Sequence, residues 1–395
     1  MHYKIINKKK KIATMMADLL GYLLWLPVNI FKKNTPLTGI KEILVIRTAY
    51  IGDVVMTLPV LKPLRELYPD ARITFLTSFA ARDIFLNNPY VDDVLAYDAF
   101  WFYPKASKEG IGDYLKFLKI LRSKRYDMVI ESRADIRDIL LLTYLCRGRY
   151  RVSYNVGGGG YLLTHVVPYR EIKHKVDYHL DMVKHLGGNI GKVEWGISLT
   201  AEEKVAVKAL LGEVGILPAD LLVGIHPGGR KGLKCWAAAK FAETADRLIS
   251  EYGAKIIFTG SPQETGLIAD IIQKMENHKQ AVNSAGKANL RIISGLISRL
   301  DLFICNDSAP IHIASAMKTP TVAIFGPSKS RETGPYGNIH RVVEKGFPCR
   351  FSCDEDVCLQ NNFNVCMEAI QVEDVLAAAR EVLNETNGRV KYHGI

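Results

Sequence analysis

The stretch EILVIRTAYIGD (residues 42–53) decides the fold of this chain. Its first six residues enclose the apolar run ILVI, which is typical of a strand buried on both faces, and a short loop then leads into an apolar helical segment. Strand-like runs recur at 71–78, 91–98 and 126–132, and a helical pattern occupies 111–123. Short apolar strands that alternate with helices predict an α/β fold with a parallel, helix-covered sheet.

A second series of the same kind begins further along the chain. Strand-like runs end in small or polar residues in LLVGIHPGG (221–229), AKIIFTGSP (254–262), DLFICNDSAP (301–310) and TPTVAIFGP (319–327). A less regular segment near 155–220 separates the two series. The total of 395 residues suits two to three domains of about 150 residues each. We therefore expect two similar α/β domains with a cleft between them.

The composition is that of a globular protein. Hydrophobic residues make up 48% and charged residues 24%, which excludes a disordered, collagen-like or disulfide-scaffold chain. The 52 lysines and arginines exceed the 41 aspartates and glutamates and give a formal charge of +11. This excess favours anionic partners, whether nucleic acid, phosphorylated small molecules or acidic lipid. The seven cysteines are an odd number, so reduced cytosolic thiols are expected rather than a secreted disulfide framework.

The N-terminus combines lysines with an apolar segment. Residues 8–11 are lysines, 12–31 are apolar apart from a few positions that include Asp18, and Lys32 and Lys33 follow. Three small or polar residues share one narrow side of a helix here: Thr14, Asp18 and Gly21. This pattern predicts a helix that lies in a membrane interface with its lysines near anionic head groups. A membrane-spanning helix and an apolar helix packed on the protein itself are the alternatives.

The loop after the first strand carries a candidate catalytic residue. In open α/β sheets, ligands bind outside the carboxyl ends of strands, and the loop from Arg47 to Asp53 lies at such an end. Gly52 alone does not make a dinucleotide fingerprint, and the chain has no Walker motif. Two interpretations of Asp53 stay open at this point: a helix N-cap and a catalytic base.

Three further loops follow strands of the second series. HPGGRKGLKCW (226–236) is a glycine-rich, basic loop before a helix, and it predicts phosphate binding through Lys234 rather than a solvated basic turn. In GSPQE (260–264), Glu264 suits either ribose hydroxyls or the dipole of its own helix. In NDSAPIH (306–312), backbone N–H groups, the Ser308 hydroxyl and His312 are expected to point at one ligand.

Other motifs carry weaker signals. Four cysteines lie close together in the sequence: Cys349, Cys353, Cys358 and Cys366. Four thiolates can hold a structural zinc, but the chain lacks the short CxxC spacing, so metal-free thiols are the preferred interpretation. The acidic run 354–356 is interpreted as a solvated turn rather than a metal-binding DxD motif. The glycine run 157–160 lacks GxGxxG spacing, so we expect a mobile loop at an acceptor site rather than a phosphate cradle.

Taken together and in order, these motifs resemble glycosyltransferase family 9, and in particular the heptosyltransferases of lipopolysaccharide core assembly. The matching strings are ILVIRTAYIGDVVMTLPVLKPLRELYPDARI (43–73), HPGGRKGLKCW (226–236), GSPQE (260–264), NDSAPIHIASAMKTPTVAIFGPS (306–328) with GPYG (334–337), and the cysteine cluster ending in CMEAI (366–370). The resemblance covers roughly residues 41–385. It implies a GT-B fold, in which two Rossmann-like domains with parallel sheets face each other across a cleft.

The resemblance also implies an organisation of the chain and a set of site residues. It gives an acceptor-binding domain at 41–200, a nucleotide-sugar-binding domain at 201–370, and a helix returning to the first domain, with a tail, at 371–395. The basic, apolar membrane-interface helix predicted above, at 1–40, is specific to this chain and lies outside the resemblance. Asp53 is implied as the general base, Lys234 as the diphosphate contact and Glu264 as the ribose contact. The other implied donor-binding residues are Gly228, Gly229, Asp307, Ser308, Ala309, Pro310 and His312. The implied acceptor-binding residues are Arg47, Gly52, Arg133 and Arg137.

The implied reaction moves heptose from ADP-heptose to a lipid-linked acidic oligosaccharide of the lipopolysaccharide core, with inversion at the anomeric carbon. Neither a cofactor nor nucleic acid is expected to take part. The protein is expected in the cytoplasm, peripheral on the inner face of the cytoplasmic membrane and held there by anionic lipid. The alternatives are a nucleotide-sugar epimerase and a non-catalytic nucleotide-sugar-binding protein of the same architecture.

Overall fold

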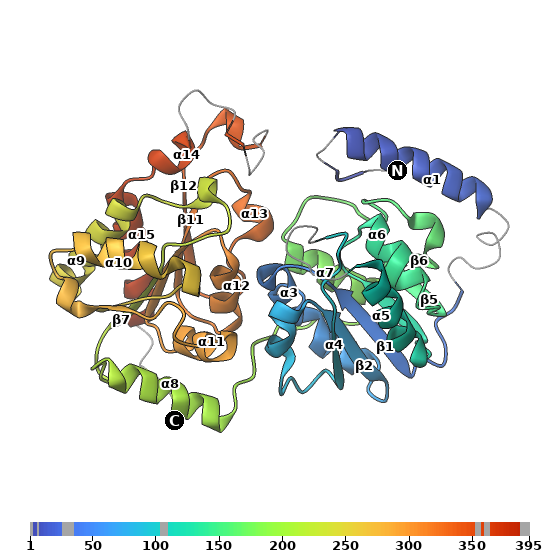
Figure 1. The fold of residues 1–395 in the computed structure, drawn as a ribbon, viewed down its shortest axis with the longest axis horizontal. Coiled ribbons are helices and arrows are strands. Elements are labelled where there is room, and N and C mark those ends of the chain that lie inside the picture. Colours follow the sequence, from blue (N-terminus) through green and yellow to red (C-terminus); the bar gives the residue numbers. More distant parts are fainter. Residues whose placement is uncertain are drawn as a thin grey trace. The chain divides into compact units, whose positions relative to one another are not determined.

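The computed structural model describes residues 3–5, 8–25, 35–102, 110–351, 357–358 and 364–387. The chain divides into two compact units, Met1–Trp195 and Gly196–Ile395, and each contains one sheet (Figure 1). The expected domain boundary at residue 200 therefore falls just inside the second unit, immediately before its first helix, α8 (Ala201–Glu213).

The sheet of the first unit is parallel throughout, in the order β3-β2-β1-β4-β5-β6. Its strands are β1 (Glu42–Arg47), β2 (Arg72–Thr77), β3 (Asp93–Ala96), β4 (Met128–Glu131), β5 (Tyr150–Ser153) and β6 (His165–Val166). The apolar run of β1 is buried because β1 lies between β2 and β4, where Ile43 pairs with Ile73 and Met128. This is the Rossmann strand order, and the chain changes direction along the sheet between β1 and β4.

Helical segments cover this sheet. They are α3 (Ile51–Val55), η1 (Leu58–Val60), α4 (Leu61–Leu67), η2 (Phe79–Phe85), α5 (Ile111–Ser123), α6 (Ile136–Asp138), η3 (Ile139–Tyr144), η4 (Gly160–Leu162) and α7 (Lys175–His185). In α5, Tyr114, Leu118 and Leu121 recur at helical spacing on one face and join the core around Leu44. The predicted helix at 111–123 is confirmed.

The sheet of the second unit repeats this topology, in the order β12-β11-β10-β7-β8-β9. Its strands are β7 (Leu222–His226), β8 (Lys255–Phe258), β9 (Ala281–Asn283), β10 (Leu302–Asn306), β11 (Thr321–Phe325) and β12 (His340–Glu344). All its pairings are parallel. The change of direction lies here between β7 and β10, which correspond to β1 and β4 of the first unit.

Helices also cover the second sheet, and the last of them corrects an expectation. After α8, the helical segments are η5 (Gly232–Lys234), α9 (Ala238–Tyr252), η6 (Pro262–Glu264), α10 (Thr265–Lys274), η7 (His278–Gln280), α11 (Leu290–Ser298), α12 (Ala309–Ala316), α13 (Ser330–Thr333), η8 (Pro348–Phe351), α14 (Val365–Glu368) and α15 (Val372–Asn387). The family resemblance implied that the last helix returns to the first domain. Instead, Val375, Ala379 and Leu383 of α15 are buried in the core of the second unit, beside residues of α9 and the sheet. The apolar stripe of α15 thus completes the second unit.

The N-terminal helix α1 (Lys8–Leu24) belongs to the first unit and packs beside η4. Its buried residues are Thr14, Asp18 and Gly21, the three that the sequence placed on one narrow side. Within the described parts of the chain, no helix has both the length and the apolar character needed to cross a membrane.

Candidate active site

The predicted site residues gather at the two points where the sheets change direction. In the first unit, Arg47 ends β1, and its Nη1 donates a hydrogen bond of 2.8 Å to the carbonyl oxygen of Ser132, just beyond β4. In the second unit, Asn306 ends β10, and its Nδ2 donates one of 2.7 Å to the carbonyl oxygen of Pro227, just beyond β7. Such switch points are where open α/β sheets bind ligands, so each unit carries a candidate half-site.

Asp53 lies in the first turn of α3, and its carboxylate joins two cations. Arg47 Nη2 is 3.0 Å and Lys175 Nζ is 3.1 Å from the same oxygen, Oδ1. The N-cap of α3 is Tyr50, whose side chain makes no cap hydrogen bond, so the interpretation of Asp53 as the N-cap residue is wrong. The Asp53 side chain is 23% exposed and can be reached by a ligand. Gly52 beside it is buried.

Helix α7 supplies Lys175 and holds the loop after α3. His179, one turn further along α7, is buried, and its Nδ1 lies 2.9 Å from the carbonyl oxygen of Met56. Burial and the nearby charge of Arg47 lower the pKa of His179 to about 3, so the imidazole is neutral and donates this hydrogen bond. The contact fixes α7 against the segment that carries Asp53.

The predicted acceptor arginines lie in the segment after β4. Arg137 donates from Nε and Nη2 to both carboxylate oxygens of Asp135, at 2.9 and 2.7 Å. Arg133 stacks on Phe102, with its guanidinium carbon 3.3 Å from the ring centroid, and its Nη2 is 3.8 Å from Asp135. Burial opposes ionisation of Asp135, but the hydrogen bonds from Arg137 and the charge of Arg133 lower its pKa to about 2. The two arginines therefore share one carboxylate.

Two buried carboxyl groups, those of Glu131 and Asp138, contact this segment. Glu131 accepts hydrogen bonds from the backbone N–H groups of Arg133 and Ala134, at 2.7 and 2.8 Å. Asp138 accepts one of 2.8 Å from the indole of Trp101. Burial, and for Glu131 the charge of Asp138, raise the pKa of both groups. The Arg133–Arg137 segment is thus held by its own backbone and by buried acids.

In the second unit, Lys234 and Asp307 form an ion pair. Lys234 Nζ lies 2.8 Å from Asp307 Oδ2, and the side chains are 15% and 8% exposed. Ser328 donates a further hydrogen bond to the same oxygen. Asn306 organises the turn because its Oδ1 accepts from the N–H of Trp236 at 3.1 Å. The loops after β7, β10 and β11 therefore meet around Asp307.

The loop glycines lie against Glu264 and Cys235. A Cβ on Gly228 would lie 1.8 Å from a Glu264 carboxylate oxygen, and one on Gly229 would lie 3.2 Å from Cys235 Sγ. Only glycine allows Gly228 and Glu264 to approach this closely. Glu264 also accepts hydrogen bonds from the N–H and hydroxyl of Ser261, at 2.7 and 2.8 Å, and so forms the capping box of its own helical turn.

Helix α12 begins at the same edge of the sheet. Ser308 is its N-cap residue, but its hydroxyl donates to the carbonyl oxygen of Asn306 at 3.3 Å and makes no side-chain cap. Ala309 and Pro310 form the start of the helix; Pro310 has no backbone N–H, and the N–H of Ile311 donates to the carbonyl oxygen of Ser308 at 3.1 Å. His312 is 6% exposed. The predicted donor-binding residues are thus brought to one edge of the second sheet.

The cysteine cluster is described only in part. Cys349, Cys358 and Cys366 line one small pocket of about 10 Å³ together with Leu233. Cys353 and the acidic run 354–356 lie outside the described residues. Among the described residues, no three His, Cys, Asp or Glu side chains are arranged to hold a metal. The preference for metal-free thiols over a four-cysteine zinc site stays a prediction.

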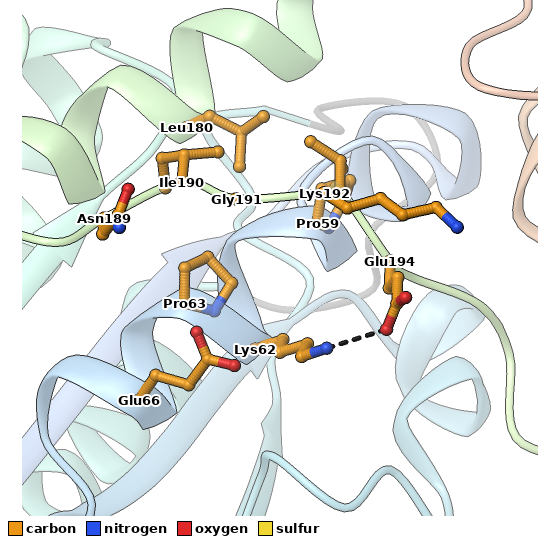
Figure 2. A pocket seen from close by; sticks show the side chains of 11 residues that line it. Pro59, Lys62, Pro63, Glu66, Leu180, Asn189, Ile190, Gly191, Lys192 and Glu194 are labelled. Atoms are coloured by element: carbon orange, nitrogen blue, oxygen red, sulfur yellow. Dashed lines mark hydrogen bonds and ion pairs between the residues drawn. The ribbon is translucent and has the colours of Figure 1, made fainter.

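A larger pocket of about 160 Å³ lies elsewhere in the first unit (Figure 2). It is formed by η1, α4 and the segment 189–194, and Lys62 Nζ pairs with Glu194 at 2.7 Å on its rim. Within the described chain, its lining includes none of the residues predicted for catalysis or binding. The switch points, rather than this pocket, therefore stay the candidate active site.

Comparison with known proteins agrees with this geometry. A family model described as glycosyltransferase family 9 (heptosyltransferase) matches residues 114–361, more than half of the chain. The chain belongs to glycosyltransferase family 9. It is 28% identical over 357 residues to lipopolysaccharide heptosyltransferase 3 of Escherichia coli K12, and the matched region covers 85% of this chain and 96% of that protein.

Solved structures of similar proteins share the fold. A family 9 glycosyltransferase from Veillonella parvula matches with a TM-score of 0.76 and 24% identity, covering 89% of this chain and 100% of that one. The ADP-heptose lipopolysaccharide heptosyltransferase II of E. coli matches with a TM-score of 0.70 and 21% identity, covering 88% and 99%. The prediction of a family 9 enzyme with two parallel Rossmann-like sheets is confirmed.

Sequence reasoning missed two residues of this candidate site. Ser328 follows β11 as Ser308 follows β10, and a small hydroxyl residue at a strand end was a signal that could have identified it. Lys175 lies 122 positions from Asp53 in a segment without a strand pattern, so no local signal marked it.

Proposed function

We propose that this protein transfers heptose from ADP-heptose to an acidic, lipid-linked acceptor of the lipopolysaccharide core, with inversion at the anomeric carbon. Membership of family 9 supports sugar transfer, and the names of two similar E. coli proteins support heptose, its ADP-linked donor and a lipopolysaccharide acceptor. The observation that carries the proposal is the carboxylate of Asp53, oriented at one switch point by Arg47 and Lys175.

Asp53 acts as the general base in this proposal. The acceptor hydroxyl attacks the anomeric carbon as the bond from that carbon to the diphosphate oxygen breaks on the opposite side. The hydroxyl proton passes to Asp53, and the bonding electrons leave with ADP. A base must lie within hydrogen-bond reach of the proton it removes, and two cations on Oδ1 fix where the carboxylate points.

The second unit binds the donor. Lys234 and the positive end of the α12 helix dipole supply positive charge to the diphosphate as it leaves. Gly228 and Gly229 let the backbone approach the nucleotide, and Glu264 beside Gly228 accepts from the ribose hydroxyls. The proposal assigns charge stabilisation to protein groups and includes no cofactor.

The first unit binds the acceptor. Arg133 and Arg137 present guanidinium groups at the switch point, and such groups pair well with sugar carboxylates or phosphates. The acceptor carboxylate would compete with Asp135 for these arginines. Because this acceptor is anchored in lipid, the enzyme is proposed to work at the inner face of the cytoplasmic membrane.

The Asp53→Asn variant tests the base assignment. Asparagine keeps the size of the side chain and an oxygen for Arg47, but it cannot take up a proton. We expect the rate of heptose transfer to fall by about 10²- to 10⁴-fold. The dissociation constant of the donor, measured by calorimetry, should stay nearly unchanged.

A matched control is Asp70→Asn, since Asp70 is an exposed carboxylate of the same unit. This variant should keep full activity. If Asp53→Asn transfers heptose at a rate close to that of the wild type, Asp53 is not the base.

A further inference from the structure

Helix α1 is amphipathic, but its polar side faces the protein and its apolar side faces outward, the reverse of the usual arrangement. Asp18 and Thr14 are 2% and 6% exposed and face the protein, whereas large apolar side chains face away from it. Those exposed side chains are Ile12, Met15, Met16, Leu19, Leu20, Leu23 and Leu24. They run along a helix that is about 25 Å long at ~1.5 Å per residue. A monomeric soluble protein seldom exposes so continuous an apolar surface unless it contacts a partner.

Hydrogen bonds attach the polar face of α1 to the first unit. Asp18 Oδ1 accepts a hydrogen bond of 2.7 Å from the N–H of Gly159, and Oδ2 accepts one of 2.7 Å from the hydroxyl of Tyr3. The glycine run 157–160 is thus shaped around a carboxylate of the chain itself. Gly158 and Gly159 have φ angles of +90° and +79°, which disfavour other residues at these positions.

Close packing reinforces this attachment. A Cβ on Gly21 would lie 2.3 Å from the ring of Tyr161, so α1 can approach the loop only with glycine there. Tyr22 and Trp25 contact the same ring, each at 5.7 Å between ring centroids. The helix is therefore fixed to the first unit with its apolar side outward.

The charge of α1 indicates the chemistry of its partner. Lys8 and Lys9 are exposed at the start of the helix, and Lys32 and Lys33 follow it in the sequence. Lysines that flank an apolar helical face are typical of helices that lie in the interface of an anionic bilayer. Among the described residues of α1, Asp18 is the acidic one, and it is turned away from this face.

The attachment also connects α1 to the predicted acceptor segment. Lys10 Nζ lies 3.9 Å from Asp135 Oδ2, the carboxylate that Arg133 and Arg137 share. A Cβ on Gly157 would lie 1.8 Å from the carbonyl oxygen of Ala134. Helix α1 therefore contacts both the glycine run and the acceptor segment, and the glycine run also contacts the acceptor segment.

We propose that α1 is a pre-docked membrane-binding helix. Its apolar face enters the head-group region of an anionic bilayer while Asp18 keeps its polar face on the glycine run, so that bilayer binding places the Arg133–Arg137 segment at the lipid surface. The role of that segment in acceptor binding rests on the proposed function, whereas bilayer binding itself does not.

Vesicle binding by the full chain tests the proposal. The test variant replaces three side chains that are 62–64% exposed: Met16→Gln, Leu19→Gln and Leu23→Gln. We expect the wild type to sediment with vesicles of phosphatidylglycerol and phosphatidylethanolamine and less with vesicles of phosphatidylcholine. The partition coefficient of the variant onto the acidic vesicles should be lower by about tenfold or more.

A control variant removes exposed apolar residues of the second unit: Val205→Gln, Leu217→Gln and Leu267→Gln. It should bind vesicles as the wild type does. Equal partitioning of the α1 variant and the wild type overturns the proposal, and so does equal binding to neutral and acidic vesicles. A wild-type dimer in solution that the α1 substitutions make monomeric, without any loss of vesicle binding, assigns the face to a second copy instead.

Activity separates this proposal from the proposed function. On a delipidated, soluble acceptor the α1 variant should transfer heptose as fast as the wild type, and on a vesicle-embedded acceptor it should be slower. An equal loss with both acceptors contradicts a membrane role. If the wild type transfers no sugar at all, the proposed function fails while the vesicle measurements still decide the role of α1.

Discussion

Lys234 and Asp307 restrain each other in the second unit, and this pairing bears on donor binding. The lysine is mostly buried beside the carboxylate, and Ser328 donates to the same carboxylate oxygen. A bound diphosphate would draw Lys234 from Asp307 or share its charge. Lys234→Ala is therefore expected to weaken binding of ADP by about tenfold or more, measured as a dissociation constant by calorimetry.

Two controls accompany this measurement. Lys274→Ala removes an exposed lysine of the same unit and should leave the dissociation constant unchanged. Thermal unfolding shows whether Lys234→Ala is still folded, because the substitution leaves Asp307 without this cation. An unchanged affinity in a folded Lys234→Ala variant would remove Lys234 from the donor site.

Single residues show where sequence reasoning reaches its limit. The spacing around Asp53 fitted a cap and a base equally, because both roles use a carboxylate at the start of a helix. The structure has Tyr50 at the cap position and pairs Asp53 with Lys175, a partner distant in the sequence. The role of Asp53 as base stays a proposal. For Glu264 the structure shows the cap, and the ribose contact stays a proposal.

At the scale of elements, His179 makes the packing of α7 sensitive to pH. Its pKa is about 3 in the folded protein, against an ordinary value of 6.5. As the pH falls below 6.5, the unfolded chain gains a proton on this residue that the folded chain does not accept until about pH 3. The free energy of unfolding should therefore fall by up to about 1.4 kcal/mol per pH unit in this window.

Urea unfolding of the wild type and of His179→Gln at several values between pH 7 and pH 4.5 checks this prediction. Glutamine can donate to the Met56 carbonyl but does not titrate, so the variant should lose less stability on acidification. His278→Gln, at an exposed position of the second unit, should behave as the wild type does. Parallel pH profiles for the wild type and His179→Gln would show that folding does not lower the pKa of His179.

The elements also differ in how well the sequence predicts them. Helix α5 and strand β1 carry long, regular apolar patterns, and their predicted bounds agree with the structure. Strands β6 and β9 have two and three residues, too few to show any periodicity. The apolar stripe of α15 predicts that one face is buried but does not say against which unit, so its expected return to the first domain was wrong.

At the scale of the whole molecule, the repeated strand–helix series correctly predicted two parallel sheets. The order of strands could not be worked out from the residues alone, because β1 pairs with β4 and β7 with β10 across long stretches of chain. That order creates the two switch points and collects Arg47, Asp53, Lys234 and Asp307 there. The glycine run was predicted to be a mobile loop at an acceptor site. The hydrogen bond from Gly159 to Asp18 joins residues 141 positions apart, so the sequence could not predict it.

The central claim is heptose transfer, and one measurement tests it most directly. The wild-type protein is incubated with ADP-heptose and a lipopolysaccharide core acceptor, and the acceptor is examined by mass spectrometry while released ADP is followed. We predict that the acceptor gains one heptose and that ADP release depends on its presence. An unchanged acceptor, with the nucleotide sugar either epimerised or merely bound, would contradict the account.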